Sequence, residues 1–168
     1  MSQTLHSLGE PEYATIKEPG TVEGGDIILA GSVAFIGFSN RTNKEGIKQL
    51  SRLLNALGYE VRTIPVPFPY LHIGGAMSVI GPKKVLCCKN LFPDNFFNGF
   101  NKIEVPFNTF VSGNVISIGN NEIIADISNM EVIDKLKNTG IYVHTIDLSE
   151  FIKGTGGPSC LIMPVERK

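Results

Sequence analysis

The same succession of strands and a helical or turn segment is predicted three times along the chain. This repetition constrains the fold more than any other feature of the sequence. In each repeat two short strands meet at a tight turn, a helical or turn segment follows, and a further strand closes the unit. The repeats cover about residues 18–66, 71–106 and 113–147. A period of about 40 to 50 residues is typical of arrays or propellers of supersecondary units, in which neighbouring units bury a shared core.

The first repeat shows the pattern most clearly. We predict strands over residues 26–30 and 33–37, a helix over 43–57 that ends at Gly58, and a strand over 59–65. The helix has apolar residues at helical spacing, so one face is expected to cover a sheet. These residues are Ile47, Leu50, Leu53, Leu54 and Leu57.

The other two repeats follow the same order. In the second, strands are predicted over 76–80, 83–88 and 102–105, with a helical or turn segment over 94–100. In the third, strands are predicted over 114–118, 122–126 and 141–146, with a helix over 130–139 that Gly140 caps.

Both ends of the repeat pattern look like cuts in a longer one. Residues 13–17 are predicted to be the closing strand of an earlier unit, and the segment 154–166 includes an apolar stretch, 161–165, predicted to be a further strand. We therefore expect the three repeats to be part of a larger array.

Composition excludes several classes of function. The 168 residues carry a net charge of -1 and are 42% hydrophobic, which fits one domain with a buried core. Lysine and arginine are scattered, so nucleic acid is not an expected partner. Since no apolar run reaches about 18 residues and residues 1–6 lack the features of a signal peptide, we expect neither membrane insertion nor secretion.

The cysteines point to a reducing, cytoplasmic compartment. There are three, and Cys87, Cys88 and Cys160 lack the spacing of a disulfide framework or a zinc site. We therefore predict no bound metal and no cofactor. Cys87 and Cys88 lie in an apolar strand pattern and are predicted to be structural.

Cys160 ends a glycine-rich run, Gly-Thr-Gly-Gly-Pro-Ser-Cys over residues 154–160. Glycine lets the backbone approach a ligand closely, and a thiol held at such a turn can act as a nucleophile. A buried structural cysteine is the alternative, because free cysteine often packs as a small hydrophobe.

Two further motifs carry groups suited to acid–base chemistry. Leu-His-Ile-Gly-Gly over 71–75 places His72 in a loop, and histidine is a common general acid and base. Val-Glu-Gly-Gly-Asp over 22–26 places Glu23 and Asp26 on either side of two glycines, and carboxylates are natural partners of a planar cation. Asp26 has two equally favoured roles: it binds a substrate, or it satisfies backbone donors at the start of its strand.

The fourth motif, Phe-Ser-Asn-Arg-Thr-Asn over 38–43, ends a predicted strand before a helix that Thr42 or Asn43 can cap. Its Arg41 can make a bidentate contact with a carboxylate, or it is a surface arginine near a helix start. Asn114 and the Asn120-Asn121 pair are expected at turns and strand ends, and no chemistry is assigned to them.

Together the four motifs resemble the guanidino-group modifying enzymes of the pentein superfamily, namely the dimethylarginine dimethylaminohydrolase and arginine deiminase families. The resemblance extends from about Glu18 to the end of the chain. It implies an α/β propeller of strand-strand-helix-strand units, of which this chain contains about three of the usual five. It therefore also implies an incomplete propeller.

The resemblance assigns roles to five residues. Cys160 is expected to be the nucleophile at a guanidinium carbon, His72 the general acid and then the general base, and Glu23 a group that orients His72 or contacts the guanidinium. Arg41 is expected to hold the α-carboxylate of a free amino acid, and Asp26 is the second substrate-binding candidate.

The implied reaction is hydrolysis of free arginine, with or without Nω-methyl groups, to citrulline and an amine through a covalent thiouronium intermediate on Cys160. Arginine deiminases and amidinotransferases use the same cysteine and histidine, so the motifs leave these alternatives open. A catalytically silent binding module on the same scaffold is the alternative from another class.

The resemblance breaks at the N-terminal side. In the resembled enzymes that region contributes an acidic partner for the guanidinium, further carboxylate-binding groups and part of a lid, and nothing before Glu18 matches it. We therefore expect a fragment of a longer enzyme, a homo-oligomer, or another chain that supplies the absent units.

Overall fold

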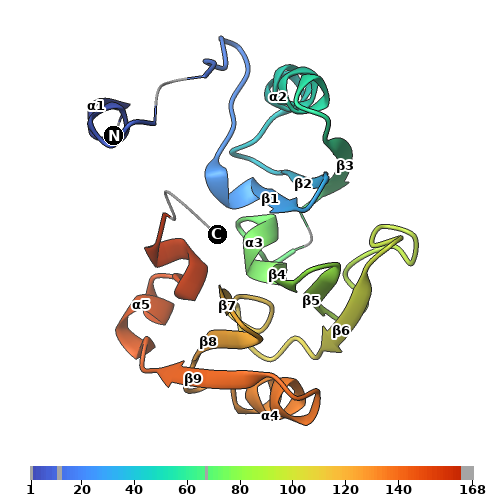
Figure 1. Ribbon diagram of the computed structural model, residues 1–168, viewed down its shortest axis with the longest axis vertical. Helices are drawn as coiled ribbons and strands as arrows, with labels where there is room; N and C mark the ends of the chain where they lie inside the picture. Colours follow the sequence, from blue (N-terminus) through green and yellow to red (C-terminus); the bar gives the residue numbers. More distant parts are fainter. Residues whose placement is uncertain (1, 11–12, 67, 164–168) are drawn as a thin grey trace.

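Three small sheets follow one another in an arc in the computed structural model, which describes residues 2–10, 13–66 and 68–163 (Figure 1). Each sheet has three strands in sequence order. In every sheet the first two strands are antiparallel and the last two are parallel. Each predicted repeat therefore corresponds to one sheet, and the molecule is an α/β protein.

The first sheet contains β1 (Ile27–Ala30), β2 (Val33–Phe38) and β3 (Glu60–Pro65). A parallel pair needs a crossover connection, and α2 (Lys44–Ala56) supplies it between β2 and β3. Of the two predicted caps, Asn43 is the one used: its Oδ1 accepts a hydrogen bond from the Gly46 N–H at 2.8 Å. Gly58 follows the helix at φ +86°, as predicted for its cap.

The second sheet contains β4 (Met77–Gly81), β5 (Lys84–Cys88) and β6 (Asn101–Val105). Its crossover over residues 94–100 consists of turns, so the turn alternative of the prediction is the one observed. The connection is held by aromatic packing: Phe96 lies 5.1 Å from Phe35 of the first sheet, and Phe97 lies 5.5 Å from Phe35, between ring centroids.

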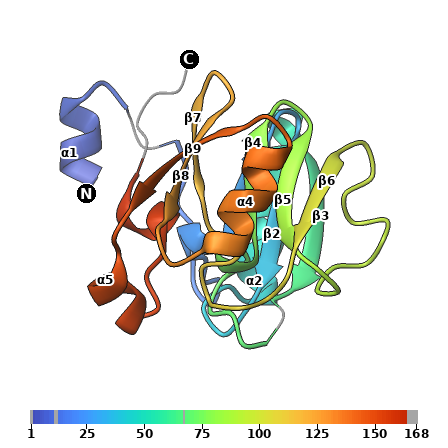
Figure 2. The ribbon, with the colours of Figure 1, turned by 90° about the horizontal axis from the view of Figure 1, so that it is seen from below.

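The third sheet contains β7 (Ile116–Gly119), β8 (Glu122–Asp126) and β9 (Tyr142–Ile146), with α4 (Met130–Asn138) as the crossover. Asn120 and Asn121 form the β7–β8 turn with φ of +48° and +62°. Buried Val132, Ile133 and Leu136 share a core cluster with Ile123 and Ala125 of β8, so this helix packs against the sheet. The view from below shows α4 beside the strands of this sheet (Figure 2).

The first strands of the three sheets meet near the middle of the arc. β1 contacts β4, and β4 contacts β7, while the short α3 (Ile73–Ala76) packs against β1 and β4 (Figure 1). One core cluster joins the first and second sheets, and another joins the second and third. The loops next to these inner strands therefore face a common space.

Two predicted strands at the ends of the pattern are wrong. Residues 13–17 form no strand. Cys160 lies in a short 3₁₀ helix, Pro158–Leu161, and residues 162–163 also lie outside any strand; residues 164–165 of that prediction lie outside the described part. Proline at the first position of the 3₁₀ helix favours this turn over a strand. Helices α1 (Ser2–Ser7) and α5 (Ser149–Lys153) were not predicted.

Candidate active site

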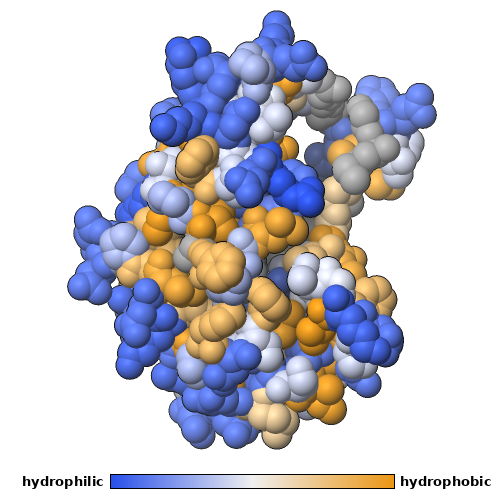
Figure 3. Space-filling view, turned by 180° about the vertical axis from the view of Figure 1, so that it is seen from behind, coloured by the Kyte–Doolittle hydropathy of each residue, from blue (hydrophilic) through white to orange (hydrophobic). Residues whose placement is uncertain are grey.

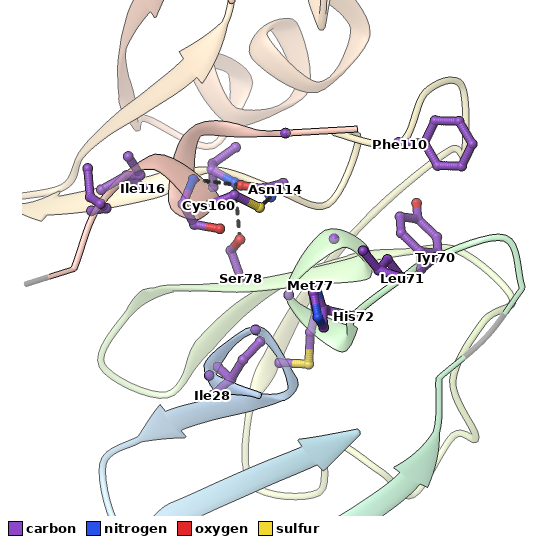
Figure 4. A pocket seen from close by; sticks show the side chains of 18 of the residues that line it. Ile28, Tyr70, Leu71, His72, Met77, Ser78, Phe110, Asn114, Ile116 and Cys160 are labelled. Carbon is purple, nitrogen blue, oxygen red and sulfur yellow. Dashed lines mark hydrogen bonds between the residues drawn. The ribbon is translucent and has the colours of Figure 1, made fainter. Parts of the chain in front are cut away.

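A pocket of about 1070 Å³ lies where β1, β4 and β7 meet. Its walls also include the segment around His72 and the glycine-rich turn that ends at Cys160 (Figure 4). Apolar side chains such as Ile28, Leu71 and Met77 form much of the lining. A few polar groups in an apolar pocket are typical of a small-molecule site.

The thiol of Cys160 is exposed at this pocket. The Cys160 N–H donates to the Gly157 carbonyl at 3.0 Å, which closes the turn. Gly157 is required here, because a Cβ at this residue would lie 2.6 Å from Cγ of Asn114. The glycine therefore lets the turn pack directly on the Asn114 amide.

His72 immediately precedes α3, and its side chain is 21% exposed. Figure 4 shows it on the wall that faces Cys160. Its Nε2 lies 2.5 Å from Oε2 of Glu23. The ring rests on Gly25, where a Cβ would lie 2.7 Å from Cγ of His72. The two glycines between Glu23 and Asp26 thus make room for the imidazole.

Glu23 also holds Arg41. Its Oε1 accepts a hydrogen bond from Nη1 of Arg41 at 2.8 Å. The Arg41 guanidinium and then His72 hold the pKa of the Glu23 carboxyl below its usual range. Neither Glu23 nor Arg41 is among the residues that line the pocket; Glu23 reaches it through His72, and the Arg41 side chain is 49% exposed.

The loops that carry Glu23 and Arg41 are joined by hydrogen bonds. The Glu23 N–H donates to Oγ1 of buried Thr42 at 3.0 Å. Oγ of Ser39 accepts from the N–H groups of Arg41 and Thr42 at 3.0 and 3.1 Å. These contacts fix the two predicted functional residues relative to each other.

Asp26 is fully buried beneath this network. Its Oδ2 accepts from Oγ of Ser39 at 2.6 Å, and its Oδ1 accepts from the N–H of Ile73 at 3.2 Å. These contacts support the second of its two predicted roles, although the backbone donor belongs to α3 and not to its own strand. No contact to the pocket supports the substrate-binding role.

The remaining cysteines are buried, as predicted. Burial raises the pKa of Cys87 to about 12 and also raises the pKa of Cys88. Sγ of Cys88 lies 2.9 Å from the hydroxyl of Tyr70. Both thiols are therefore poor nucleophiles in the folded protein.

The described residues show neither a metal-binding cluster nor a membrane-spanning helix. Within residues 2–10, 13–66 and 68–163, no group of three His, Cys, Asp or Glu side chains is placed to hold a metal ion. Among the helices in the described part of the chain, none has the length and apolar character needed to cross a bilayer.

Asn114, to which no chemistry was assigned from the sequence, also lies at the candidate site. Asn114 is 1% exposed, and its Nδ2 lies 3.4 Å from Sγ of Cys160. A signal was present: an asparagine directly before an apolar strand is expected to find hydrogen-bond partners if it is buried. The partner lies 46 positions away, so no local pattern could identify it.

Comparisons with known proteins show the family of this chain. The family model described as arginine deiminase matches residues 6–91 and 103–167. An N(G),N(G)-dimethylarginine dimethylaminohydrolase of Pseudomonas aeruginosa is 31% identical over 161 residues, covering 96% of this chain and 63% of the relative. An uncharacterised protein of Aeropyrum pernix is 27% identical over 164 residues, covering 96% of this chain and 59% of the relative.

Solved structures give the same picture. Dimethylarginine dimethylaminohydrolase from Pseudomonas aeruginosa, complexed with citrulline, has a TM-score of 0.81 at 28% identity and covers 95% of this chain. The N-terminal domain of ArgZ, a cyanobacterial arginine dihydrolase, has a TM-score of 0.83 at 18% identity, which shows a common fold. Each of these matches extends over 63% of the solved chain, so this chain spans less than two thirds of those proteins.

Proposed function

The chain belongs to the arginine deiminase family, and from that premise we propose that its pocket hydrolyses the guanidinium group of free arginine, with or without Nω-methyl groups. One observation carries the proposal: an exposed thiol, Cys160, and a histidine, His72, line the same pocket from facing walls (Figure 4). A nucleophile and an acid–base group that face one cavity are the minimum that such a reaction requires.

In the proposed reaction the thiolate of Cys160 attacks the guanidinium carbon and forms a C–S bond. The tetrahedral adduct then expels ammonia or a methylated amine, whose nitrogen takes a proton from His72 as its C–N bond breaks. A thiouronium intermediate remains on Cys160. Water, deprotonated by His72, attacks its carbon, the C–S bond breaks, and citrulline and the thiolate are formed.

Glu23 is proposed to orient His72. Its carboxylate holds Nε2, which leaves Nδ1 as the ring nitrogen for proton transfer. The negative charge also stabilises the imidazolium that forms when His72 takes a proton. Since Arg41 and His72 lower the pKa of Glu23, the carboxylate stays charged at neutral pH.

Arg41 is proposed to bind the α-carboxylate of the substrate. Its Nη1 donates to Glu23, and about half of the side chain is exposed. A planar guanidinium that binds a carboxylate through two donors selects a free amino acid over its decarboxylated amine.

We also propose that further units complete the ring around the pocket. Large apolar side chains are exposed on the third sheet: Ile118 at 50%, Tyr142 at 64% and Ile146 at 45%. Tyr142 and Ile146 lie on β9, the last strand of that sheet, and natural proteins normally cover such edges. Apolar residues also gather in the middle of the face that Figure 3 shows. The three sheets are thus proposed to be part of an incomplete propeller, completed by further residues of a longer chain, by a second copy or by another chain.

The test is citrulline formation from arginine and from dimethylarginine, with the molar mass of the active species measured by sedimentation. We expect turnover by an assembly larger than the monomer and its loss in Cys160→Ser. Addition of an amine acceptor distinguishes an amidinotransferase, because the amidino group then passes to the acceptor and ornithine is released in place of citrulline. Cys160→Ser with unchanged turnover would refute the mechanism.

A further inference from the structure

We infer that Asn114 is a positioning residue for the nucleophile: its amide holds the thiolate of Cys160 by a hydrogen bond and fixes the turn that carries it. The inference rests on the proposed function, because it assumes that Cys160 is the attacking group. It adds a residue to which neither the sequence motifs nor the proposed mechanism assigns a role.

The orientation of the amide follows from its two partners. Oδ1 of Asn114 accepts a hydrogen bond from the backbone N–H of Ser159 at 2.9 Å. A backbone N–H can only donate, so the carbonyl oxygen of the amide must face it. The NH₂ group must then face Sγ of Cys160, at 3.4 Å.

This contact supplies a hydrogen-bond donor to the sulfur, as the proposed reaction requires. A thiolate only accepts hydrogen bonds, and a donor that points at it favours the charged, nucleophilic form. Asn114 is 1% exposed, so water competes little for its amide. A hydrogen bond to a charged group is worth more in such a place than at the surface.

The backbone of Asn114 is itself held in place. Oγ of buried Ser78 donates to the Gly113 carbonyl at 2.8 Å and accepts from the Val115 N–H at 3.1 Å. Gly113 packs against the end of α3, where a Cβ would lie 2.4 Å from the carbonyl of Ala76. Figure 4 shows Asn114 beside Cys160, with Ser78 close to both.

This arrangement connects the two proposed catalytic residues. His72 precedes α3 and Ala76 ends it. Gly113 packs against Ala76, and the next residue, Asn114, contacts the Cys160 turn. Asn114 therefore sets the nucleophile relative to the acid–base group as well as stabilising its charge. Such positioning matters because misplacement by about 1 Å can cost about 100-fold in rate.

The test uses Asn114→Asp, which keeps the acceptor for Ser159 but replaces the donor with an oxygen that repels a thiolate. Asn129→Asp is the matched control, because Asn129 is also buried and donates from Nδ2 to a backbone carbonyl, that of Val111, at 2.9 Å. The readout is the rate at which iodoacetamide alkylates Cys160 at pH 7, followed by mass spectrometry of the Cys160 peptide.

We expect alkylation of Cys160 to slow by about tenfold or more in Asn114→Asp and by less than about twofold in Asn129→Asp. In an active assembly, kcat should fall while KM stays nearly constant, since the amide contacts the sulfur. The inference is overturned if Cys160 of Asn114→Asp is alkylated at the rate of the parent protein. It is also overturned if both variants slow alkylation equally. If Asn114→Asp does not fold, Asn114→Ala and Asn129→Ala are compared by the same criterion.

Failure of the inference is distinguishable from failure of the proposed function. Alkylation requires no substrate, so slowed alkylation in Asn114→Asp supports the inference even if the protein forms no citrulline. If the parent protein forms citrulline and Asn114→Asp is alkylated at the parental rate, the inference fails and the proposed function stands.

Discussion

Nε2 of His72 lies 2.5 Å from Oε2 of Glu23, and the other oxygen of the same carboxylate holds Arg41 at 2.8 Å. One carboxylate thus links the proposed acid–base group to the proposed carboxylate-binding group. The effects of substitutions at these three residues are therefore expected to be non-additive.

Glu23→Gln should lower kcat by about 100-fold or more, because the imidazolium of His72 loses the charge that stabilises it. The chain offers a matched control in a second Glu–His pair: Oε2 of Glu122 lies 2.6 Å from Nε2 of the exposed His144. Glu122→Gln should leave kcat within about twofold. Citrulline formation measures both, and an equal loss in the two variants would contradict the role of Glu23.

Gly25→Ala should displace the imidazole of His72, because the added methyl would lie 2.7 Å from its Cγ. We expect kcat to fall by about tenfold or more. At Gly24 an added Cβ meets nothing within 4 Å, so Gly24→Ala should slow turnover far less. NMR of the His72 ring signals checks the cause: they should move in Gly25→Ala and stay in place in Gly24→Ala.

Arg41→Lys should raise KM for arginine by about tenfold, because lysine lacks the planar fork that binds a carboxylate through two donors. Agmatine, which has no carboxylate, separates this effect from any disturbance of Glu23. Its kcat/KM should change much less than that of arginine. Equal losses for both substrates would assign the effect to the Glu23 contact instead.

The Glu23 contacts should also appear in the pH dependence of stability. Since Arg41 and His72 lower the pKa of Glu23 from 4.5 in the folded protein, its contribution to stability is present above that value. The contribution is lost as pH falls through the lower, folded pKa. The difference in free energy of unfolding between the parent protein and Glu23→Gln should therefore shrink below about pH 4.5, as urea titrations at several pH values can test.

Cys160 should be the thiol that reacts in the folded protein. It is exposed, whereas burial raises the pKa of Cys87 to about 12 and also raises the pKa of Cys88. Alkylation at neutral pH should label Cys160 at least about 100-fold faster than the other two. In denaturant all three should react at similar rates, and rapid labelling of Cys87 without denaturant would contradict the fold.

Much of the fold follows from local pattern. The strands and the two crossover helices appear within a few residues of their predicted positions, because alternation, helical spacing and the glycines at 58 and 140 are local signals. The predicted strand after Cys160 is wrong because an apolar run forms a strand only where a sheet edge accepts it. Over residues 161–163 the chain instead continues from a proline-led turn.

The sequence predicts the residues of the candidate site, namely Cys160, His72, Glu23 and Arg41, but it does not predict their contacts. The contacts of the Asp26 carboxylate with Ser39 and Ile73, which favour one of its two predicted roles, join residues far apart in the sequence. Asn114 was missed because its partner is determined by how the third sheet meets the final turn. A contact between residues so far apart in the sequence leaves no pattern in the residues next to either one.

Glu23 precedes the first sheet, His72 the second, and Cys160 follows the third, so no single repeat contains the site. Turnover in the proposed reaction would therefore depend on how the repeats stack. A substitution buried between two sheets, such as one at Phe35 where it meets Phe96, would lower that turnover without touching the pocket. The proposed catalytic rate would then report on how precisely the units are aligned, because small misplacements of reacting groups slow a reaction strongly.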